Sequence, residues 1–291
     1  MTKIPYDIYD IVTPLTFAIT GMSKDRKEYA AAGTGFFVAP YTALTAAHVV
    51  RFLWDRLEAP WNEHKYPKRT VNPEFFAAAV QQVDIRRPDV AAHWEITGVT
   101  PLNNTDIAFL NVVPRSEVAE KMEWPSPFPE LELLPPNPGE LVWSFGYPDA
   151  EGKHTPGESV VNFESQPTLI SGEVINYHPG GRGTWRFPQF EVTIPFEPGM
   201  SGGPVIHQGK IAGLVSYGPN LEQGKRGASF ASALWPIVGS ELSAEVDPRL
   251  QSNPVLEMLN TGAIRAANWK SIQSRIRITQ TETGDDIVEL A

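Results

Sequence analysis

Three short segments carry residue types that together could perform nucleophilic catalysis. They are a histidine after a β-rich run, an aspartate at the mouth of a strand and a serine in a glycine-dense turn, at residues 45–48, 103–108 and 198–205. A serine hydroxyl is a weak nucleophile at neutral pH, but a neighbouring imidazole can take its proton and later return it to the leaving group. A buried carboxylate would orient that imidazole and stabilise its charged form. His48, Asp106 and Ser201 are therefore the candidates for a catalytic triad.

The glycines around Ser201 meet a second requirement of acyl transfer. Glycine lets the backbone turn tightly, so that successive N–H groups can point at one spot. Such a spot can stabilise the oxyanion that forms during attack, by about 10²–10³ in rate for each donor. The expected donors are the backbone N–H groups of Gly199 and Ser201.

Each segment also has an ordinary structural explanation. A histidine near an apolar run is usually a hydrogen-bonded core residue, Asp106 could close a turn or cap a helix, and the glycines could form a tight turn and nothing more. Catalysis is favoured because the three occur together, in the order His, Asp, Ser, and each stands at the edge of an expected strand.

Together the three motifs resemble those of the chymotrypsin-fold serine proteases, and most closely the bacterial HtrA-like, trypsin-like peptidases without a PDZ domain. The resemblance covers about residues 10–240. It implies an all-β fold of two antiparallel six-stranded β-barrels, with His48 and Asp106 from the first barrel and Ser201 from the second. Further matching segments are Gly-Thr-Gly-Phe-Phe-Val at 33–38, Phe-Gly-Tyr-Pro at 145–148, Leu-Ile-Ser-Gly-Glu-Val at 169–174 and Ser-Phe-Ala at 229–231.

The resemblance also implies a strand that binds substrate. Ser216 stands where the family has a serine that hydrogen-bonds the catalytic aspartate. Ser216, Tyr217 and Gly218 resemble the segment that pairs with the backbone of an extended peptide, which would join the sheet as an added strand. The alternative is an ordinary edge strand followed by a glycine turn.

Two positions depart from the digestive proteases of this family. Met200 stands where those enzymes have an aspartate that pairs with a new N-terminus, so we expect no activation by N-terminal processing and some other contact that orders the loop. Pro195 stands at the base of the specificity pocket, with Phe196 beside it. Since neither supplies a carboxylate, we expect a neutral P1 residue, aliphatic or aromatic, rather than Lys or Arg.

The elements that must position these residues are predicted to be short strands separated by Gly and Pro turns. The chain of 291 residues contains 23 glycines and 27 prolines, which favours a loop-rich all-β protein over a helix bundle. Helical spacing predicts a short helix at 47–57, directly around His48. The expected strands are 11–20, 33–38, 42–46, 75–85, 94–99 and 106–113, then 140–145, 159–163, 169–177, 189–194, 203–207, 210–216 and 228–234.

We expect three parts in the chain. The first barrel occupies residues 1–125, the second 126–240, and a partly helical C-terminal extension 241–291. Between the barrels, the proline-rich stretch 114–139 is the expected linker, with a helical turn at 116–122. Within the extension we expect a helix at 255–267 and a β-like stretch at 275–281, and after His48 an inserted polar and aromatic loop at 58–73.

Composition excludes several classes of function. A net charge of −10 argues against general nucleic-acid binding, and the absence of cysteine removes disulfides, thiolate metal sites and a Cys nucleophile. No cofactor or metal site is expected; His64 is taken as a loop residue. The first residues do not resemble a signal peptide and no stretch resembles a membrane span, so we expect a cytoplasmic, bacterial protein.

The predicted function is a serine endopeptidase that acts on protein or peptide substrates and is regulated, with a regulatory protein among its expected partners. The main alternative is a latent or non-catalytic protease-fold module that docks peptides or a partner; chaperone-like capture is a third idea. Gly199-x-Ser201-x-Gly203 also fits the nucleophile elbow of α/β-hydrolases, but Gly-Gly-Pro-Val-Ile favours a strand after the serine, and His207 is the one histidine that follows.

Overall fold

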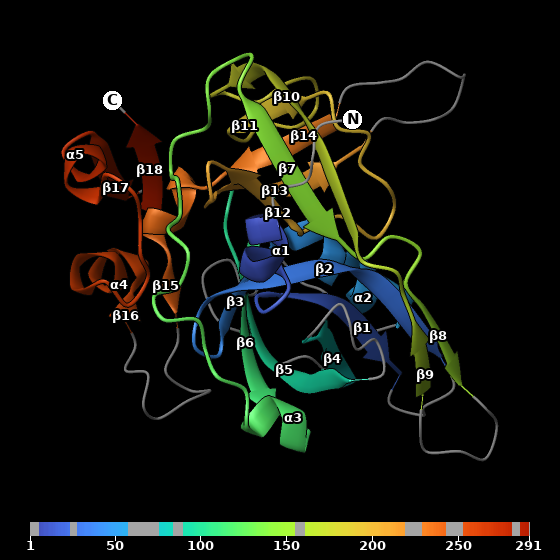
Figure 1. Ribbon diagram of the computed structural model, residues 1–291. Coiled ribbons are helices and arrows are strands. Elements are labelled where there is room, and N and C mark those ends of the chain that lie inside the picture. Colours follow the sequence, from blue (N-terminus) through green and yellow to red (C-terminus); the bar gives the residue numbers. More distant parts are fainter. Residues whose placement is uncertain are drawn as a thin grey trace.

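The computed structural model describes residues 6–23, 28–57, 76–83, 90–154, 161–218, 229–242, 253–280 and 286–290. Its strands form two closed six-stranded antiparallel barrels, one at each end of the view in Figure 1. Closure leaves neither barrel with an open edge in its sheet. The predicted all-β double barrel is therefore confirmed.

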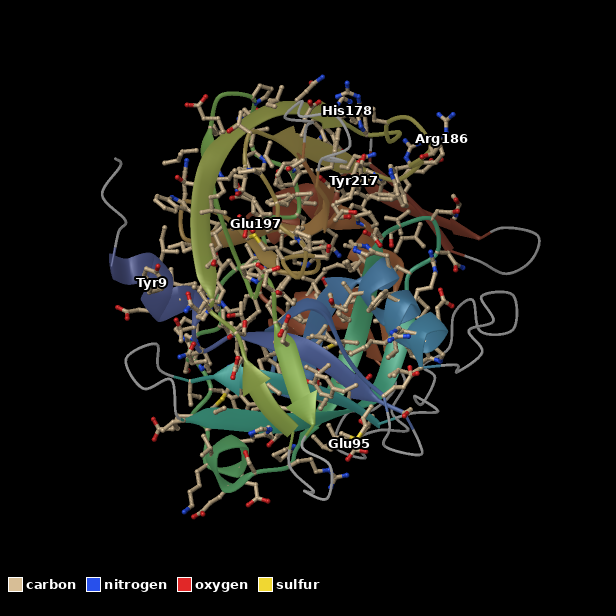
Figure 2. All side chains as sticks on the ribbon, turned by 90° about the vertical axis from the view of Figure 1, so that its right-hand side faces the viewer. Tyr9, Glu95, His178, Arg186, Glu197 and Tyr217 are labelled. Carbon is tan, nitrogen blue, oxygen red and sulfur yellow. The ribbon has the colours of Figure 1, made fainter. Side chains whose placement is uncertain are left out.

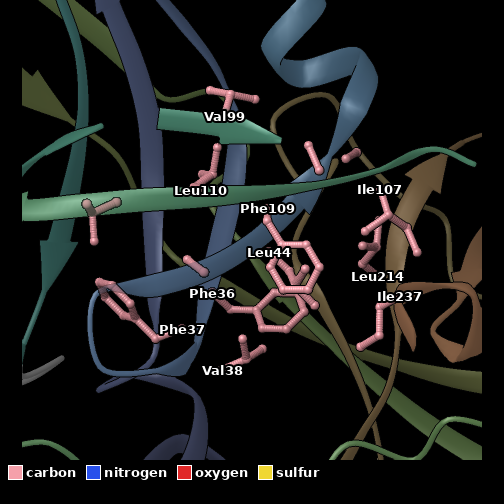
Figure 3. Close-up of a cluster of buried hydrophobic side chains, with 14 of the residues drawn as sticks. Phe36, Phe37, Val38, Leu44, Val99, Ile107, Phe109, Leu110, Leu214 and Ile237 are labelled. Atoms are coloured by element: carbon pink, nitrogen blue, oxygen red, sulfur yellow. The ribbon is translucent and has the colours of Figure 1, made fainter. Parts of the chain in front are cut away.

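The first barrel carries the histidine and the aspartate. Its strands follow one another around the barrel in the order β1-β2-β3-β6-β5-β4. Phe37 of β2 contacts Trp94 of the non-adjacent strand β5 in its interior, whereas Phe36, Leu44 and Phe109 share the other face of their strands and lie together beside Leu214 and Ile237 (Figure 3). Its strands are β1 (Thr16–Met22), β2 (Tyr29–Ala39), β3 (Thr42–Ala46), β4 (Phe76–Gln82), β5 (Ala91–Pro101) and β6 (Ile107–Pro114).

The second barrel carries the serine. Its order is β10-β11-β14-β13-β12-β7, and its interior is a separate cluster that includes Val142, Phe190 and Val215. A hairpin of β8 (Glu151–His154) and β9 (Val161–Glu164) extends from it along β2 of the first barrel (Figure 1). The barrel strands are β7 (Leu141–Gly146), β10 (Thr168–His178), β11 (Gln189–Val192), β12 (Pro204–His207), β13 (Lys210–Tyr217) and β14 (Ser229–Ala233).

An N-terminal helix was not expected. The predicted strand at 11–20 begins at Thr16, because α1 (Tyr6–Val12) precedes it. Ile8 and Val12 are four positions apart, which places them on one helical face, and they are buried in one cluster with Trp143 of the second barrel. Tertiary packing thus sets the conformation of residues that the sequence pattern assigned to a strand.

The linker between the barrels is an extended segment rather than a free loop. After α3 (Glu117–Glu120), its buried Leu131 donates its N–H to the carbonyl of Arg265 at 2.8 Å, and Glu132 donates to the carbonyl of Ile211 at 2.7 Å. The linker therefore lies between β13 and the C-terminal extension.

The C-terminal extension packs on the same hydrophobic cluster as the first barrel. The helix expected at 255–267 ends at Thr261, since Gly262 follows with a φ of +79°, the left-handed conformation that commonly terminates a helix. Figure 1 shows α4, α5, β17 and β18 gathered on one side. The elements after β14 are η1 (Trp235–Gly239), β15 (Glu241–Leu242), β16 (Asn253–Pro254), α4 (Val255–Thr261), α5 (Trp269–Gln273), β17 (Ile276–Gln280) and β18 (Asp286–Leu290).

All strands of the first barrel precede residue 125 and all strands of the second lie between 126 and 240. The domain boundaries themselves stay predictions. The loop at 58–73, with His64, lies outside the described residues. None of the described helices is long and apolar enough to cross a membrane.

Candidate active site

Strand pairing brings His48 and Asp106 together. The end of β3 lies beside the start of β6, with Ala46 opposite Ile107. His48 is at the start of α2 (Ala47–Arg56), directly after β3, and Asp106 directly precedes β6. Two residues 58 positions apart in the sequence therefore become neighbours because their strands are antiparallel partners.

The carboxylate of Asp106 binds His48 at two points. The backbone N–H of His48 donates to Oδ1 at 3.0 Å, and the ring Nδ1 donates to Oδ2 at 2.8 Å. An ionised carboxylate only accepts hydrogen bonds, so this geometry places the ring proton on Nδ1 and leaves Nε2 as a base. Asp106 is 5% exposed, whereas the His48 side chain is 35% exposed and accessible to a substrate.

Ser216 connects this pair to the second barrel. It lies in β13, is fully buried, and its hydroxyl donates to Oδ2 of Asp106. Its carbonyl oxygen accepts a hydrogen bond of 3.4 Å from the hydroxyl of Ser201. Ser216 therefore contacts both Asp106 and Ser201, as the family resemblance implied for its contact with the aspartate.

Ser201 lies in the turn that leads into β12, and a strand follows it rather than a helix. This excludes the α/β-hydrolase alternative, which requires a helix after the nucleophile. Among the described residues, the hydrogen bond of the Ser201 hydroxyl goes to Ser216, and none joins it to His48. Catalytic hydrogen bonds are often loose without substrate, and rotation about the Cα–Cβ bond is the movement that would redirect this hydroxyl.

The four residues before Ser201 form a β-turn, and their sequence is typical of a type II turn. The N–H of Met200 donates to the carbonyl of Glu197 at 3.1 Å, which closes the turn. Pro198 and Gly199 occupy its centre, and the φ of Gly199 is +90°. Type II turns favour proline and then glycine at these two positions, because the second requires a positive φ.

The carbonyl groups of Pro198 and Met200 in this turn both accept backbone hydrogen bonds. The Pro198 carbonyl accepts from the N–H of Asp149 at 3.4 Å, and the Met200 carbonyl accepts from the N–H of Gly203 at 2.9 Å. In a trans peptide the N–H points opposite to the C=O. The N–H groups of Gly199 and Ser201 therefore point away from these partners, and in the described part of the chain neither donates a hydrogen bond.

Tyr217 is in a stack of three aromatic rings. Its ring lies 5.2 Å from that of Trp185 and 4.6 Å from that of Phe230, with interplanar angles of 28° and 20°. Burial raises the pKa of Tyr217 to about 12, and its hydroxyl donates to the Gln189 side chain at 2.7 Å. Figure 2 shows Tyr217 at the same end of the molecule as His178 and Arg186, with Glu95 at the other end.

The candidate pocket residues differ in environment. Phe196 is buried, its N–H donates to the Ser229 hydroxyl at 3.2 Å, and its carbonyl oxygen would lie 2.5 Å from a Cβ added to Gly218. Phe196 and Gly218 are thus in direct contact. Pro195 is exposed, although the base of a specificity pocket is expected to be shielded from solvent, so its pocket role stays a prediction.

Thr34, Trp185 and Ser229 border the site but were not singled out individually from the sequence. Thr34 belongs to the Gly-Thr-Gly-Phe-Phe-Val segment of the family resemblance, and Ser229 belongs to its Ser-Phe-Ala segment. Trp185 follows a glycine-rich loop that has no hydrophobic periodicity, so no sequence pattern pointed to a role for this residue. The described residues contain no group of three or more His, Asp or Glu side chains suited to a metal ion.

Comparison with known proteins identifies the family. The sequence pattern of the trypsin-like peptidase domain matches residues 33–214, which include all three triad candidates. No curated protein matches this sequence.

Two solved structures have the same fold. The active form of the Rv3671c protease from M. tuberculosis is 18% identical, with a TM-score of 0.50 over 82% of this chain and 84% of that one. The scabies mite inactivated protease paralogue S-I1 is 15% identical, with a TM-score of 0.50 over 78% and 92%. Because the second is described as inactivated, activity must be argued from the site residues rather than from the fold.

Proposed function

This chain belongs to the trypsin-like peptidase family, a family of serine proteases, and we propose that it cleaves peptide bonds within proteins or peptides through Ser201, His48 and Asp106. The observation that carries the proposal is the carboxylate of Asp106, which binds the N–H and Nδ1 of His48 and the hydroxyl of Ser216. A buried carboxylate in this position holds the imidazole ready to accept a proton at Nε2.

The proposed reaction has two stages. Oγ of Ser201 bonds to the scissile carbonyl carbon while Nε2 of His48 takes the serine proton. The N–H groups of Gly199 and Ser201 bind the oxyanion that forms. The C–N bond then breaks as the imidazolium gives its proton to the leaving amine. Water, deprotonated by His48, releases the acyl group as a carboxylic acid and restores Ser201. Asp106 stays ionised throughout, and no cofactor is required.

The specificity and activation of the enzyme are part of the same proposal. Ser216, Tyr217 and Gly218 are proposed to bind the substrate backbone, and a neutral P1 residue is favoured since Phe196 and Pro195 carry no charge. Met200 is fully buried among apolar side chains. This supports an enzyme that does not need a processed N-terminus to order the oxyanion turn.

One observation favours a second candidate function, a latent or non-catalytic module that docks peptides. Among the described residues, the hydroxyl of Ser201 donates a hydrogen bond to the Ser216 carbonyl and none to His48. A partner protein that redirects this side chain would then be the activating signal. That partner and the bacterial, cytoplasmic location stay predictions.

Intact-mass analysis after fluorophosphonate treatment separates the two functions. We expect one adduct on the wild type and none on Ser201→Ala, with equal circular dichroism spectra. A wild type that forms no adduct would contradict the assembled triad and favour the docking module. Peptide-library profiling then tests the neutral P1 preference, which a preference for Lys or Arg would overturn.

A further inference from the structure

We propose that the hydroxyl of Thr34 positions the oxyanion donors; this inference rests on the proposed function. Thr34 is a fully buried residue of β2 in the first barrel, and it contacts the turn of the second. Its hydroxyl lies 2.8 Å from the carbonyl oxygen of Gly199, and its backbone N–H donates to the carbonyl of Ser201 at 2.8 Å. One residue thus holds the carbonyls of both residues whose N–H groups would bind the oxyanion.

The Thr34 hydroxyl donates its proton to the carbonyl oxygen of Gly199. The N–H of Tyr147 donates to Thr34 Oγ1 at 3.0 Å, so the oxygen acts there as an acceptor and its one proton is directed to the Gly199 carbonyl. The hydroxyl of Thr45 donates to the Thr34 carbonyl at 2.7 Å and fixes the backbone from the other side. The orientation of the Thr34 hydroxyl is therefore defined by its neighbours.

Glycine allows this close contact between the barrels. A Cβ on Gly33 would lie 2.7 Å from the carbonyl oxygen of Ser201, and a Cβ on Gly202 would lie 2.2 Å from that of Thr34. Neither position has room for a side chain. The segment around Thr34 and the turn around Ser201 are thus shaped to fit against one another.

The peptide group between Gly199 and Met200 is the part that Thr34 controls. It lies between the two oxyanion donors in sequence; its N–H is bound to the carbonyl of Glu197, and its C=O to Thr34. A planar group held at both ends cannot rotate, and the adjoining N–H groups keep their direction. In the digestive proteases an aspartate at the position of Met200 pairs with a processed N-terminus; here the Thr34 hydroxyl supplies the ordering contact.

Three variants test this role. Thr34→Val removes the hydroxyl with little change in shape, and Thr34→Ser retains it. Thr42→Val is the matched control, because Thr42 is also fully buried in the first barrel and its hydroxyl has no hydrogen-bond partner among the described residues. With a peptide substrate, we expect Thr34→Val to lower kcat about 10²-fold, as for loss of one oxyanion donor, and to leave KM within about threefold. Thr34→Ser and Thr42→Val should keep kcat within about threefold of wild type.

Amide hydrogen exchange gives a readout that does not depend on turnover. The amides of Met200 and Gly203 are bonded within the turn, so Thr34→Val should speed their exchange relative to Thr34→Ser and Thr42→Val. The proposal would be overturned if Thr34→Val left either the amide exchange or kcat unchanged. It would also be overturned if Thr34→Ser lost as much kcat as Thr34→Val. A wild type that forms no fluorophosphonate adduct, yet shows the expected exchange, would refute the proposed function and support the positioning contact.

Discussion

His48 is attached to Asp106 by its backbone as well as by its ring. The distances are 3.0 Å from the backbone nitrogen to Oδ1 and 2.8 Å from Nδ1 to Oδ2. Each carboxylate oxygen therefore has its own task, since one fixes the start of α2 and the other fixes the imidazole. Substitutions at the carboxylate can separate these tasks.

Asp106→Asn should abolish most activity while the protein stays folded. An amide can still accept from the backbone N–H of His48 through its oxygen, but it presents an N–H to Nδ1 and thereby favours the other tautomer. We expect kcat to fall about 10⁴-fold. Steady-state kinetics and thermal unfolding would check this, and a loss below tenfold would contradict the role of Asp106.

Ser216→Ala should lower activity by a smaller factor. It removes one hydrogen bond to an ionised carboxylate, worth about 1.5 kcal/mol, which corresponds to about tenfold in kcat if the whole effect appears in the transition state. Ser144→Ala is the control, because the Ser144 hydroxyl is also buried but has no hydrogen-bond partner in the described chain. Equal kcat values for the two variants would show that Ser216 does not support Asp106.

Gly199→Ala should disrupt the oxyanion turn. Its φ of +90° is unfavourable for alanine, and the new Cβ would lie 2.5 Å from the carbonyl oxygen of Tyr147. We expect kcat to fall by at least about 10²-fold. Gly139 has a similar φ of +86° but no atom within 4 Å of an added Cβ, so Gly139→Ala carries the backbone cost of about 1–2 kcal/mol without the collision. It should lower thermal stability and leave kcat unchanged.

Alkaline pH should destabilise the fold through Tyr147. Burial raises the pKa of this tyrosine from 10.0 to about 12, and its hydroxyl donates to the Thr16 carbonyl at 3.2 Å. Between pH 10 and about pH 12 the folded protein keeps the Tyr147 proton, whereas the unfolded chain releases it. The contribution of this group to the free energy of unfolding is therefore fully present below pH 10, and it falls by about 1.4 kcal/mol per pH unit as the pH rises. Urea unfolding at several pH values should show a shallower decline for Tyr147→Phe, and equal slopes would contradict this assignment.

The sequence predicted the barrel strands well because they follow local rules, whereas the resemblance to the family implied their arrangement in two barrels. Alternating and continuous apolar runs bounded by glycine and proline gave nearly every barrel strand, and the helix that follows β3 was expected from its spacing. The residues of α1 were assigned in part to a strand, since their helix is stabilised by Trp143 and Phe145, which lie far away in the sequence. The end of α4 was placed too late because Gly262 was not recognised as its terminating residue.

The candidate site was predictable where a residue type itself suggests chemistry. His48, Asp106, Ser201 and Gly199 were proposed in this way. Thr34 was not, because its function comes from a contact with Gly199 across 165 residues, and a threonine in a strand gives no local sign of such a contact. The same holds for Trp185, which joins the site by stacking on Tyr217.

The position of the linker determines when the protein can finish folding during synthesis. Leu131 donates its N–H to Arg265, and Ala267 donates back to the carbonyl of Leu131. These partners leave the ribosome about 130 residues after the linker, at roughly 5–20 residues per second. The backbone groups of Leu131 must therefore wait for many seconds without these partners. The residues that complete its pairing follow β14, so the linker reaches its final contacts only after the strands of both barrels have been made.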